Sequence, residues 1–326
     1  RYFLISTAGN GKVTNYDGTQ LKISGEDVLG FCATQLGSTT AGKWHMLLDG
    51  SAKGVKPNAI TSISASDDGT RTYVLFQGSN QVQIVNTGGS TPTNIGVVNV
   101  EAGSTAIAAS ANGTRAFVAN YNANTVSMID TSGATPTVRS IPIGATPVSV
   151  AVSANGTRAF TVNTDSTVSI INASGGTPTV TSVNVGSNPT DVAVSADGTR
   201  AFVTNLYSGT VSIINTSGAS PTVTDVTLDY SPNAVKVSDN GAVAIVNSYY
   251  GDRVTIVKYN GTTATTTTLA LPVSSYLSDC IAISDDGTRA FITSQSNAKY
   301  ALGVIDTTVA SPTVTWFAAD APMYHV

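Results

Sequence analysis

Short stretches of alternating apolar and polar residues run through this chain and return in the same order. The segment from 188 to 228 predicts four strands, which span residues 190–195, 200–204, 210–215 and 222–228. Ala196-Asp197-Gly198 joins the first two strands, and a glycine in such a tight turn adopts a positive φ without strain. The segment is therefore predicted to fold as four antiparallel strands joined by short turns.

The same four-strand pattern repeats along most of the sequence. Its turn glycine recurs at intervals of 42 to 46 residues, at Gly69, Gly113, Gly156, Gly198, Gly241 and Gly287. A four-stranded unit of this length, repeated in tandem, is typical of a β-propeller. The second strand of the unit occurs seven times, at residues 2–6, 72–76, 116–120, 159–163, 201–205, 242–247 and 290–294. We therefore predict an all-β chain with one domain over residues 1–326, a seven-bladed β-propeller of four-stranded antiparallel blades.

The two ends of the chain are predicted to share one blade. Residues 1–6 match a second strand with no first strand before it, and residues 321–326 match the start of a first strand. A propeller uses such a split unit to close its ring, whereas an open solenoid caps its two ends. Blade one is therefore expected to combine residues 1–51 with residues 321–326, and an insertion at 8–26 separates its second strand from its third.

Two motifs of the repeat match a known family. Residues 194–205 read Val-Ser-Ala-Asp-Gly-Thr-Arg-Ala-Phe-Val-Thr-Asn, and residues 209–215 read Gly-Thr-Val-Ser-Ile-Ile-Asn. They resemble the YVTN-type β-propeller repeat of archaeal and bacterial surface-layer proteins, and the resemblance extends over residues 58–317. It implies the propeller fold but no activity, because family members include cell-surface scaffolds, secreted or periplasmic proteins and propeller subunits of redox enzymes. Blade one departs from the pattern.

Composition narrows the class of partner. The chain has 16 basic and 20 acidic residues, a formal net charge of −4 and only 11% charged residues. It has no basic patch for a nucleic acid and no apolar segment of the roughly 20 residues that span a bilayer, so we expect neither nucleic-acid binding nor membrane insertion. The Thr-, Ser- and Asn-rich composition favours an extracellular or cell-surface location, and Arg1 in the first position is expected to follow a removed export signal.

Residue types that serve catalysis or metal binding are scarce. Cys32 and Cys280 are the only cysteines, and His45 and His325 are the only histidines. Each cysteine lies in an apolar strand pattern and is expected to pack as a small hydrophobic residue, with a disulfide or a reactive thiol as the alternative. The histidines are predicted to lie on an outer and an inner strand, so each is expected to have a structural or surface role, and no metal, cofactor or catalytic set is predicted. The Asp-Gly turns lack the ligand spacing of a calcium loop and are interpreted as hairpin turns.

Arginines follow these turns in five repeats and are expected to form a ring at one end of the propeller. They are Arg71, Arg115, Arg158, Arg200 and Arg289. We predict that they pair with turn carboxylates or backbone carbonyls, and an anion site is the alternative, because a guanidinium group suits either role.

Tyrosines collect in loops that are predicted to lie at the opposite end. Because successive strands alternate in direction, the loops after the second strands and the loops between blades emerge together. Eight of the twelve tyrosines lie in or beside these loops, at Tyr16, Tyr121, Tyr207, Tyr230, Tyr249, Tyr250, Tyr276 and Tyr300. A tyrosine ring stacks on sugars or anchors a protein partner, so these residues and the neighbouring Asp252 are candidate binding residues. The alternative is that the tyrosines cover the blade ends.

Lys236 interrupts the pattern of the first strand. The other repeats have Ala or Ser at this position, which is predicted to lie near the central channel. Since a buried charge is normally matched, we favour a pair between Lys236 and a nearby carboxylate such as Asp239. Binding of an anionic ligand is the alternative.

Three functions fit these observations. The first is a non-catalytic scaffold or adhesion module that binds a protein or a glycan through the tyrosine-rich loops, with flanking domains or within a surface assembly. The second is a carbohydrate-active lyase or hydrolase with Tyr and Asp at the channel mouth. The third is the propeller subunit of a redox complex, whose partner supplies the cofactor, because this chain has no Cys-x-x-Cys-His motif for haem. We favour the first because the sequence has no recognisable catalytic set.

Overall fold

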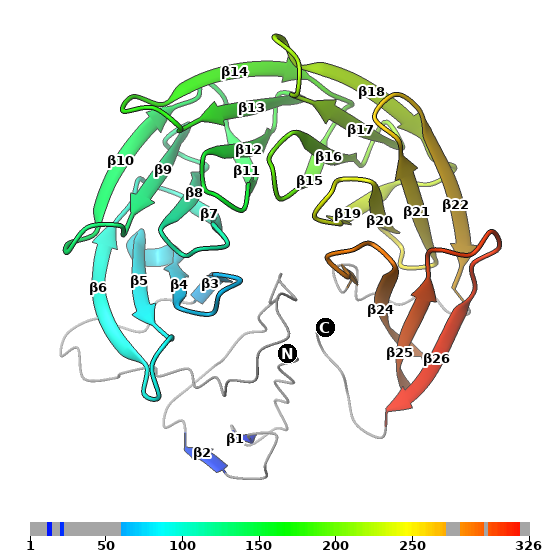
Figure 1. The fold of residues 1–326 in the computed structure, drawn as a ribbon, viewed down its shortest axis with the longest axis horizontal. Coiled ribbons are helices and arrows are strands. Elements are labelled where there is room, and N and C mark those ends of the chain that lie inside the picture. The colour runs from blue at the N-terminus through cyan, green and yellow to red at the C-terminus, as the bar shows by residue number, and fades with distance from the viewer. Residues whose placement is uncertain (1–11, 15–19, 23–59, 272–280, 297–298, 320–326) are drawn as a thin grey trace.

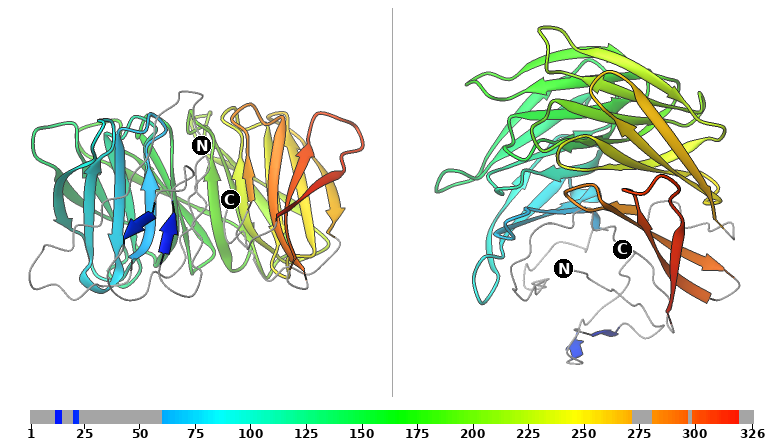
Figure 2. Two further views of the ribbon diagram at one scale, coloured as in Figure 1. Left: turned by 90° about the horizontal axis from the view of Figure 1, so that it is seen from below. Right: turned by 45° about the vertical axis from the view of Figure 1, so that its right-hand side comes forward.

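The computed structural model describes residues 12–14, 20–22, 60–271, 281–296 and 299–319. Within these residues it contains six four-stranded antiparallel sheets and one two-stranded sheet. The six larger sheets surround a common axis, each with its first strand nearest the axis and its fourth strand at the rim (Figure 1). In side view the strands run between two ends, where turns and loops gather (Figure 2). The protein is therefore all-β, and its sheets are the blades of a β-propeller.

Each blade follows the order of the chain from the axis to the rim. The first described blade contains β3 (Ile60–Ala65), β4 (Arg71–Phe76), β5 (Gln81–Asn86) and β6 (Thr93–Asn99), with a short 3-10 helix, η1 (Gln77–Ser79), after β4. The next two contain β7 (Ser104–Ala109), β8 (Arg115–Asn120), β9 (Thr125–Asp130) and β10 (Thr137–Pro142), then β11 (Pro147–Val152), β12 (Arg158–Asn163), β13 (Thr167–Asn172) and β14 (Thr179–Asn184).

The remaining three blades repeat this order. They contain β15 (Pro189–Val194), β16 (Arg200–Asn205), β17 (Thr210–Asn215) and β18 (Thr222–Thr227), then β19 (Pro232–Val237), β20 (Val243–Ser248), β21 (Arg253–Tyr259) and β22 (Ala264–Ala270), and finally β23 (Ile281–Ile283), β24 (Arg289–Ser296), β25 (Lys299–Asp306) and β26 (Val314–Ala319).

These strands confirm the four-strand unit predicted from the sequence, and every observed second strand lies within two residues of its predicted position. Six blades are described, in keeping with a ring of seven. The predicted seventh blade, from residues 1–51 and 321–326, lies outside the described residues apart from a short hairpin, β1 (Lys12–Thr14) and β2 (Gln20–Lys22), in the predicted insertion. The closure of the ring and the assignment of residues 1–326 to one domain remain predictions.

Each hydrophobic layer of the core lies between two neighbouring blades. In β16 the residues alternate between its two neighbours: Phe202 packs with Val235 and Val246 of the following blade, and Val203 packs with residues of the preceding blade. The second and third strands are buried on both faces, whereas the outermost strands are largely exposed. The repeat therefore folds because each blade buries its two apolar faces against its neighbours.

Candidate functional site

The antiparallel blades give the propeller two chemically different ends. The turns that follow the first and third strands of each blade lie at one end, which we call the turn end. The loops that follow the second strands and the connections between blades lie at the other, which we call the loop end. The predicted tyrosine residues that the structure describes belong to the loop end.

A buried asparagine anchors the base of the loop after each of three second strands. Asn205, the last residue of β16, donates from its amide nitrogen to Thr210 Oγ1 at 3.0 Å and to Ser212 Oγ at 2.8 Å in β17. Asn120 and Asn163 make the same pair of bonds to a threonine and a serine of their own blades. The residues at the base of the loop are therefore held in place, and the residues in the middle of the loop project from this base.

This asparagine is a positioning residue that the sequence reasoning did not assign. Its signal is present in the chain, because the asparagine at the end of the second strand is followed after four or five residues by Thr-Val-Ser. The pattern occurs at Asn120, Asn163 and Asn205. A repeated polar residue in an otherwise apolar strand indicates a buried hydrogen-bonded network.

Four of the predicted tyrosines are exposed on loops of the loop end. Tyr207 is 78% exposed and Tyr250 is 66% exposed, followed by Tyr249 at 50% and Tyr121 at 42%. Tyr249 and Tyr250 contact each other edge to face, with ring centroids 5.4 Å apart and an interplanar angle of 86°. Tyr207 belongs to the preceding blade. These four residues form what we call the tyrosine face, and three of them lie on two adjacent blades.

The other predicted tyrosines differ from these four. Tyr230 is partly buried, packs against the apolar layer between two blades, and donates from its hydroxyl to Thr255 Oγ1 at 2.8 Å. Burial raises the pKa of Tyr230 far above its ordinary value. Tyr300 lies in β25, and Tyr16 and Tyr276 lie outside the described residues. Tyr230 thus supports the loop end from inside.

Charged residues brace the loop that carries Tyr249 and Tyr250. Asp252 accepts a hydrogen bond from Ser248 Oγ at 2.7 Å, and its second oxygen lies 3.5 Å from Arg253 Nε. The same arginine pairs with Asp229 at 2.7 Å, across the connection between the two blades. Asp252, predicted as a binding residue, therefore also fixes the loop on which the tyrosine pair stands.

Lys236 pairs with a carboxylate as predicted, but the predicted partner was wrong. Its ammonium lies 3.6 Å from Asp191 Oδ2 in the preceding blade. Asp239 is three residues beyond Lys236, past the end of β19, and side chains at odd separations along a strand point to opposite faces. Asp191, which also accepts a hydrogen bond from Val235 N at 3.1 Å, lies on the adjoining inner strand. The pair therefore connects neighbouring blades beside the axis.

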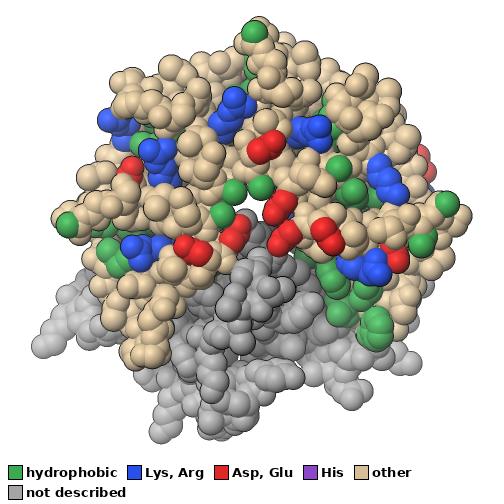
Figure 3. All heavy atoms as spheres, in the orientation of Figure 1, with side chains coloured by type: hydrophobic (Ala, Val, Ile, Leu, Met, Phe, Trp, Pro, Cys, Tyr) green, Lys and Arg blue, Asp and Glu red, His purple; other side chains and the backbone are tan. Residues whose placement is uncertain are grey.

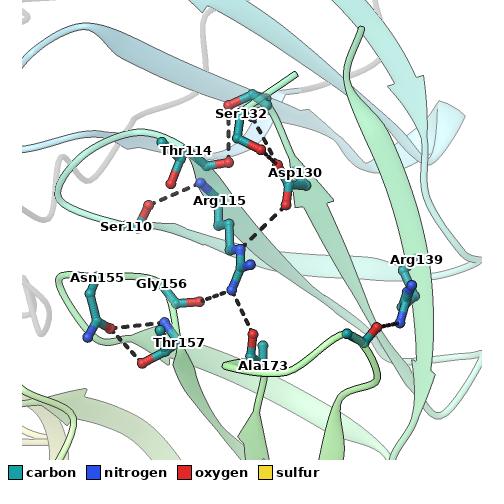
Figure 4. A network of polar contacts seen from close by, with 12 residues as sticks. Ser110, Thr114, Arg115, Asp130, Ser132, Arg139, Asn155, Gly156, Thr157 and Ala173 are labelled. Atoms are coloured by element: carbon teal, nitrogen blue, oxygen red, sulfur yellow. Dashed lines mark hydrogen bonds and ion pairs between the residues drawn. The ribbon is translucent and has the colours of Figure 1, made fainter. Parts of the chain in front are cut away.

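At the turn end, arginines connect one blade to the next. The Arg115 guanidinium donates to the carbonyls of Gly156 at 3.2 Å and Ala173 at 2.7 Å in the following blade, and its Nε lies 3.5 Å from Asp130 (Figure 4). Burial would raise the pKa of Asp130, but hydrogen bonds from Ser132 and the charge of Arg115 outweigh it and hold this pKa below its ordinary value. The Arg115 side chain therefore connects its own blade to the following blade.

The same contact recurs in the next two blades, where it agrees with the predicted pairing to carbonyls, whereas Arg71 donates to Thr70 O of its own blade. Arg158 donates to the carbonyls of Gly198 and Thr216, and Arg200 to the carbonyl of Asn240 at 3.0 Å. Arg289 instead pairs with Asp306 of its own blade at 2.9 Å. In the first described blade a tyrosine makes the connection, because Tyr73 donates from its hydroxyl to Gly113 O at 2.7 Å.

Carboxylates gather around the axis at the turn end, as the surface view shows (Figure 3). Three of them occupy the first position of a hairpin turn, at Asp67, Asp239 and Asp285, and we call these the axial carboxylates. The other three described blades have Ala111, Ala154 and Ala196 at this position. Sequence reasoning did not single out this cluster. Its signal was the replacement of alanine by aspartate in three of six turns.

The axial carboxylates interact unfavourably when ionised. Burial, followed by the charges of Asp239, Asp285 and Asp68, raises the pKa of Asp67 to about 6. Burial and a neighbouring aspartate likewise raise the pKa values of Asp239 and Asp285. The turns are nevertheless held together, because backbone bonds run from Ala196 N to Asp239 O at 2.8 Å and from Asp239 N to Asp285 O at 2.9 Å.

The described residues contain no metal site and no membrane-spanning helix. No group of three or more His, Cys, Asp or Glu side chains there is placed to hold a metal ion. No helix in the described part of the chain has the length and apolar character needed to cross a membrane. Cys32, Cys280, His45 and His325 lie outside the described residues.

Comparison with known proteins supports the fold class. No protein-family model matches the chain, and no curated protein matches it in sequence. A protein of unknown function from Desulfotomaculum acetoxidans DSM 771 superposes with a TM-score of 0.64 at 16% identity, covering 83% of this chain and 88% of its own.

Two further structures extend this likeness. A candidate 6-phosphogluconolactonase from Bacteroides fragilis NCTC 9343 has a TM-score of 0.60 at 15% identity, covering 81% of this chain and 85% of its own. The β-propeller domain of Cps50 (Swd1) from Myceliophteria thermophila has a TM-score of 0.60 at 10% identity, covering 83% and 90%. At these identities the likeness establishes a β-propeller fold, and propellers serve many functions.

Proposed function

We propose that this protein is a non-catalytic binding module of the extracellular space or cell surface, and that its tyrosine face takes a protein or glycan ligand. The observation that carries the proposal is the exposure of Tyr207, Tyr249 and Tyr250 on loops of two adjacent blades. Binding residues are commonly found on loops that a rigid scaffold positions.

The tyrosine face has the properties of a preorganised surface. The Tyr249–Tyr250 contact and the Ser248–Asp252–Arg253 interactions restrain one loop, and the buried Asn205 restrains the other. Restrained side chains lose less entropy on binding. Tyrosine also combines an apolar ring with a hydroxyl, which suits both sugar rings and protein anchors.

The choice of a binding module over an enzyme rests on the chemistry of both ends. The carboxylates beside the tyrosines, Asp229 and Asp252, pair with Arg253, and the arginines of the turn end donate to backbone carbonyls. These groups serve the scaffold. The resemblance of the repeat to surface-layer propeller repeats and the low content of charged residues support an extracellular location.

Replacement of Tyr207, Tyr249 and Tyr250 by Ala tests the proposal. Binding to a glycan array and capture of proteins from the native cell surface are measured for the wild-type protein and for the triple variant. We expect the triple variant to lose the ligand while its thermal unfolding midpoint stays unchanged, because the three side chains project into solvent.

A matched variant replaces Val97, Val138 and Val309 by Ala. These side chains are also exposed but lie outside the loop end, on or beside the outer strands. This variant is expected to keep full binding. Equal binding by the wild-type protein and the tyrosine variant would exclude the tyrosine face as the binding site. The class of the ligand follows from whether a protein or a glycan is captured.

A further inference from the structure

Four Asn-Gly pairs lie in turns of the described residues, at Asn112-Gly113, Asn155-Gly156, Asn240-Gly241 and Asn260-Gly261. In such a pair the backbone nitrogen of the glycine can attack the side-chain carbonyl of the asparagine, because no Cβ shields it. The reaction requires that this nitrogen lose its proton. A glycine N–H that is held in a hydrogen bond is therefore protected.

Three of the four glycines are held in this way. Gly113 N donates to Ser110 O at 2.9 Å, Gly156 N to Ser153 O at 2.9 Å, and Gly241 N to Ser238 O at 2.8 Å. All three glycines are buried and belong to the hairpin turns between the first and second strands. The hairpin turn of the repeat thus holds the glycine nitrogen, the nucleophile of the reaction, in a hydrogen bond in these three pairs.

The fourth pair lies in a different turn, between β21 and β22. Gly261 is partly exposed, and its N–H donates no hydrogen bond among the residues that the structure describes. Only its carbonyl is engaged, as the acceptor of a bond from Tyr259 Oη at 2.8 Å. The attacking nitrogen of this pair is therefore accessible to solvent base.

Like the hairpin asparagines, whose Oδ1 atoms accept hydrogen bonds from Thr114 N, Thr157 N and Ala242 N, Asn260 has a polarised side-chain carbonyl. Its Oδ1 accepts two backbone bonds, from Thr262 N at 2.9 Å and from Thr263 N at 2.8 Å. Two donors aimed at a carbonyl oxygen stabilise the negative charge that forms on it when a nucleophile adds. Its Nδ2, the leaving nitrogen, donates to Thr263 Oγ1 at 3.0 Å.

We propose that Asn260 is a site of spontaneous deamidation in the folded protein, and that the hairpin turns protect Asn112, Asn155 and Asn240. Gly261 N gives its proton to solvent and bonds to Asn260 Cγ, Nδ2 takes up a proton from solvent, the Cγ–Nδ2 bond breaks, and ammonia leaves. Water then opens the cyclic imide at either carbonyl, which leaves aspartate or isoaspartate.

The modification changes the turn in two ways. It adds a carboxylate to a turn that lies against Arg200, whose Nη2 is 3.4 Å from the position that a Cβ on Gly261 would occupy. The isoaspartate form also adds one backbone atom between β21 and β22. Deamidation at Asn260 thus marks one blade at the turn end, away from the tyrosine face.

Peptide mapping by mass spectrometry tests the proposal. The purified protein is incubated in mildly alkaline buffer, sampled over days and digested, and aspartate and isoaspartate are counted at each described Asn-Gly pair. We expect Asn260 to convert at least about tenfold faster than the other three, which is the rate factor that one retained hydrogen bond at the nucleophile supplies.

The same experiment in urea supplies the control. Once the chain is unfolded, the four pairs should convert at similar rates, because each is then an Asn-Gly pair in open chain. Equal rates in the folded protein, or an intact Asn260 beside converted hairpin asparagines, would overturn the proposal. Replacement of Asn260 by Gln should abolish the signal at this turn and leave the other three rates unchanged.

Discussion

Replacement of Asp67 by Ala should stabilise the protein at neutral and alkaline pH. Asp67 occupies a turn position where three other blades already have alanine, so the change introduces no new backbone requirement. Asp67 Oδ1 is buried and makes no hydrogen bond among the described residues. What the variant removes is an unfavourable charge beside Asp239 and Asp285.

The magnitude follows from the pKa. Burial and acidic neighbours raise the pKa of Asp67 from 3.8 to about 6. At pH values above both of these pKa values, a shift of that size lowers the free energy of unfolding by about 3 kcal/mol. Because the side chain is partly exposed, solvent screening reduces the effect, and we expect about 1–2 kcal/mol.

The sign also follows. Between pH 4 and pH 6 the folded state holds a proton at Asp67 that the unfolded state has released, so in the wild-type protein this contribution to stability falls as pH rises and stays low above pH 6. The variant removes that loss. Its gain in stability should therefore be largest near pH 8 and small near pH 4.

Thermal unfolding at pH 4, 6 and 8 measures the effect, with a rise of about 1–2 °C in the midpoint expected at pH 8 for each kcal/mol gained. Asp68→Asn is the matched control. Burial would raise the pKa of Asp68, but hydrogen bonds from Ser66 and Thr70 outweigh it and lower this pKa, so the control should lose stability at neutral pH. An equal gain at pH 4 and pH 8 for Asp67→Ala would refute the reasoning.

Three other changes test the scaffold. Tyr73→Phe should lower the free energy of unfolding by about 1–2 kcal/mol, because it removes the hydrogen bond to Gly113 O and keeps the aromatic ring. Chemical denaturation measures the change, and an unchanged midpoint would show that this hydrogen bond between blades does not stabilise the fold. Asn205→Ala should cost about 1–3 kcal/mol and weaken ligand binding at Tyr207, whereas a variant with full binding and stability would show that the loop base needs no anchor. Deletion of residues 321–326 should lower the thermal midpoint markedly if these residues complete blade one.

The repeat was predictable because it is a local property. A turn glycine, a polar residue before it and alternating β-branched residues on either side define each strand and hairpin without reference to any other blade. The observed β15 to β18 accordingly lie within one residue of their predicted bounds. The end of the propeller at which the loop tyrosines lie could be predicted by the same route, because the direction of each strand fixes the end at which its loop emerges.

Contacts between blades were harder to predict. The sequence indicated that Lys236 needs a carboxylate, but the choice of Asp191 over Asp239 depends on which inner strand lies alongside β19. Tyr230 was grouped with the exposed tyrosines because it lies in a connecting loop, yet its ring packs inside the loop end. Loop membership alone does not specify burial, which depends on the neighbouring blade.

The amino-acid sequence by itself determined the four-strand unit, its repetition and the end of the propeller on which the tyrosines stand, because short-range turn chemistry and side-chain alternation encode all three. Only the tertiary structure decided which charged groups meet across blades and brought Asp67, Asp239 and Asp285 together at the axis. These features arise when residues more than forty positions apart are packed side by side, and no local sequence pattern specifies which of these residues come into contact.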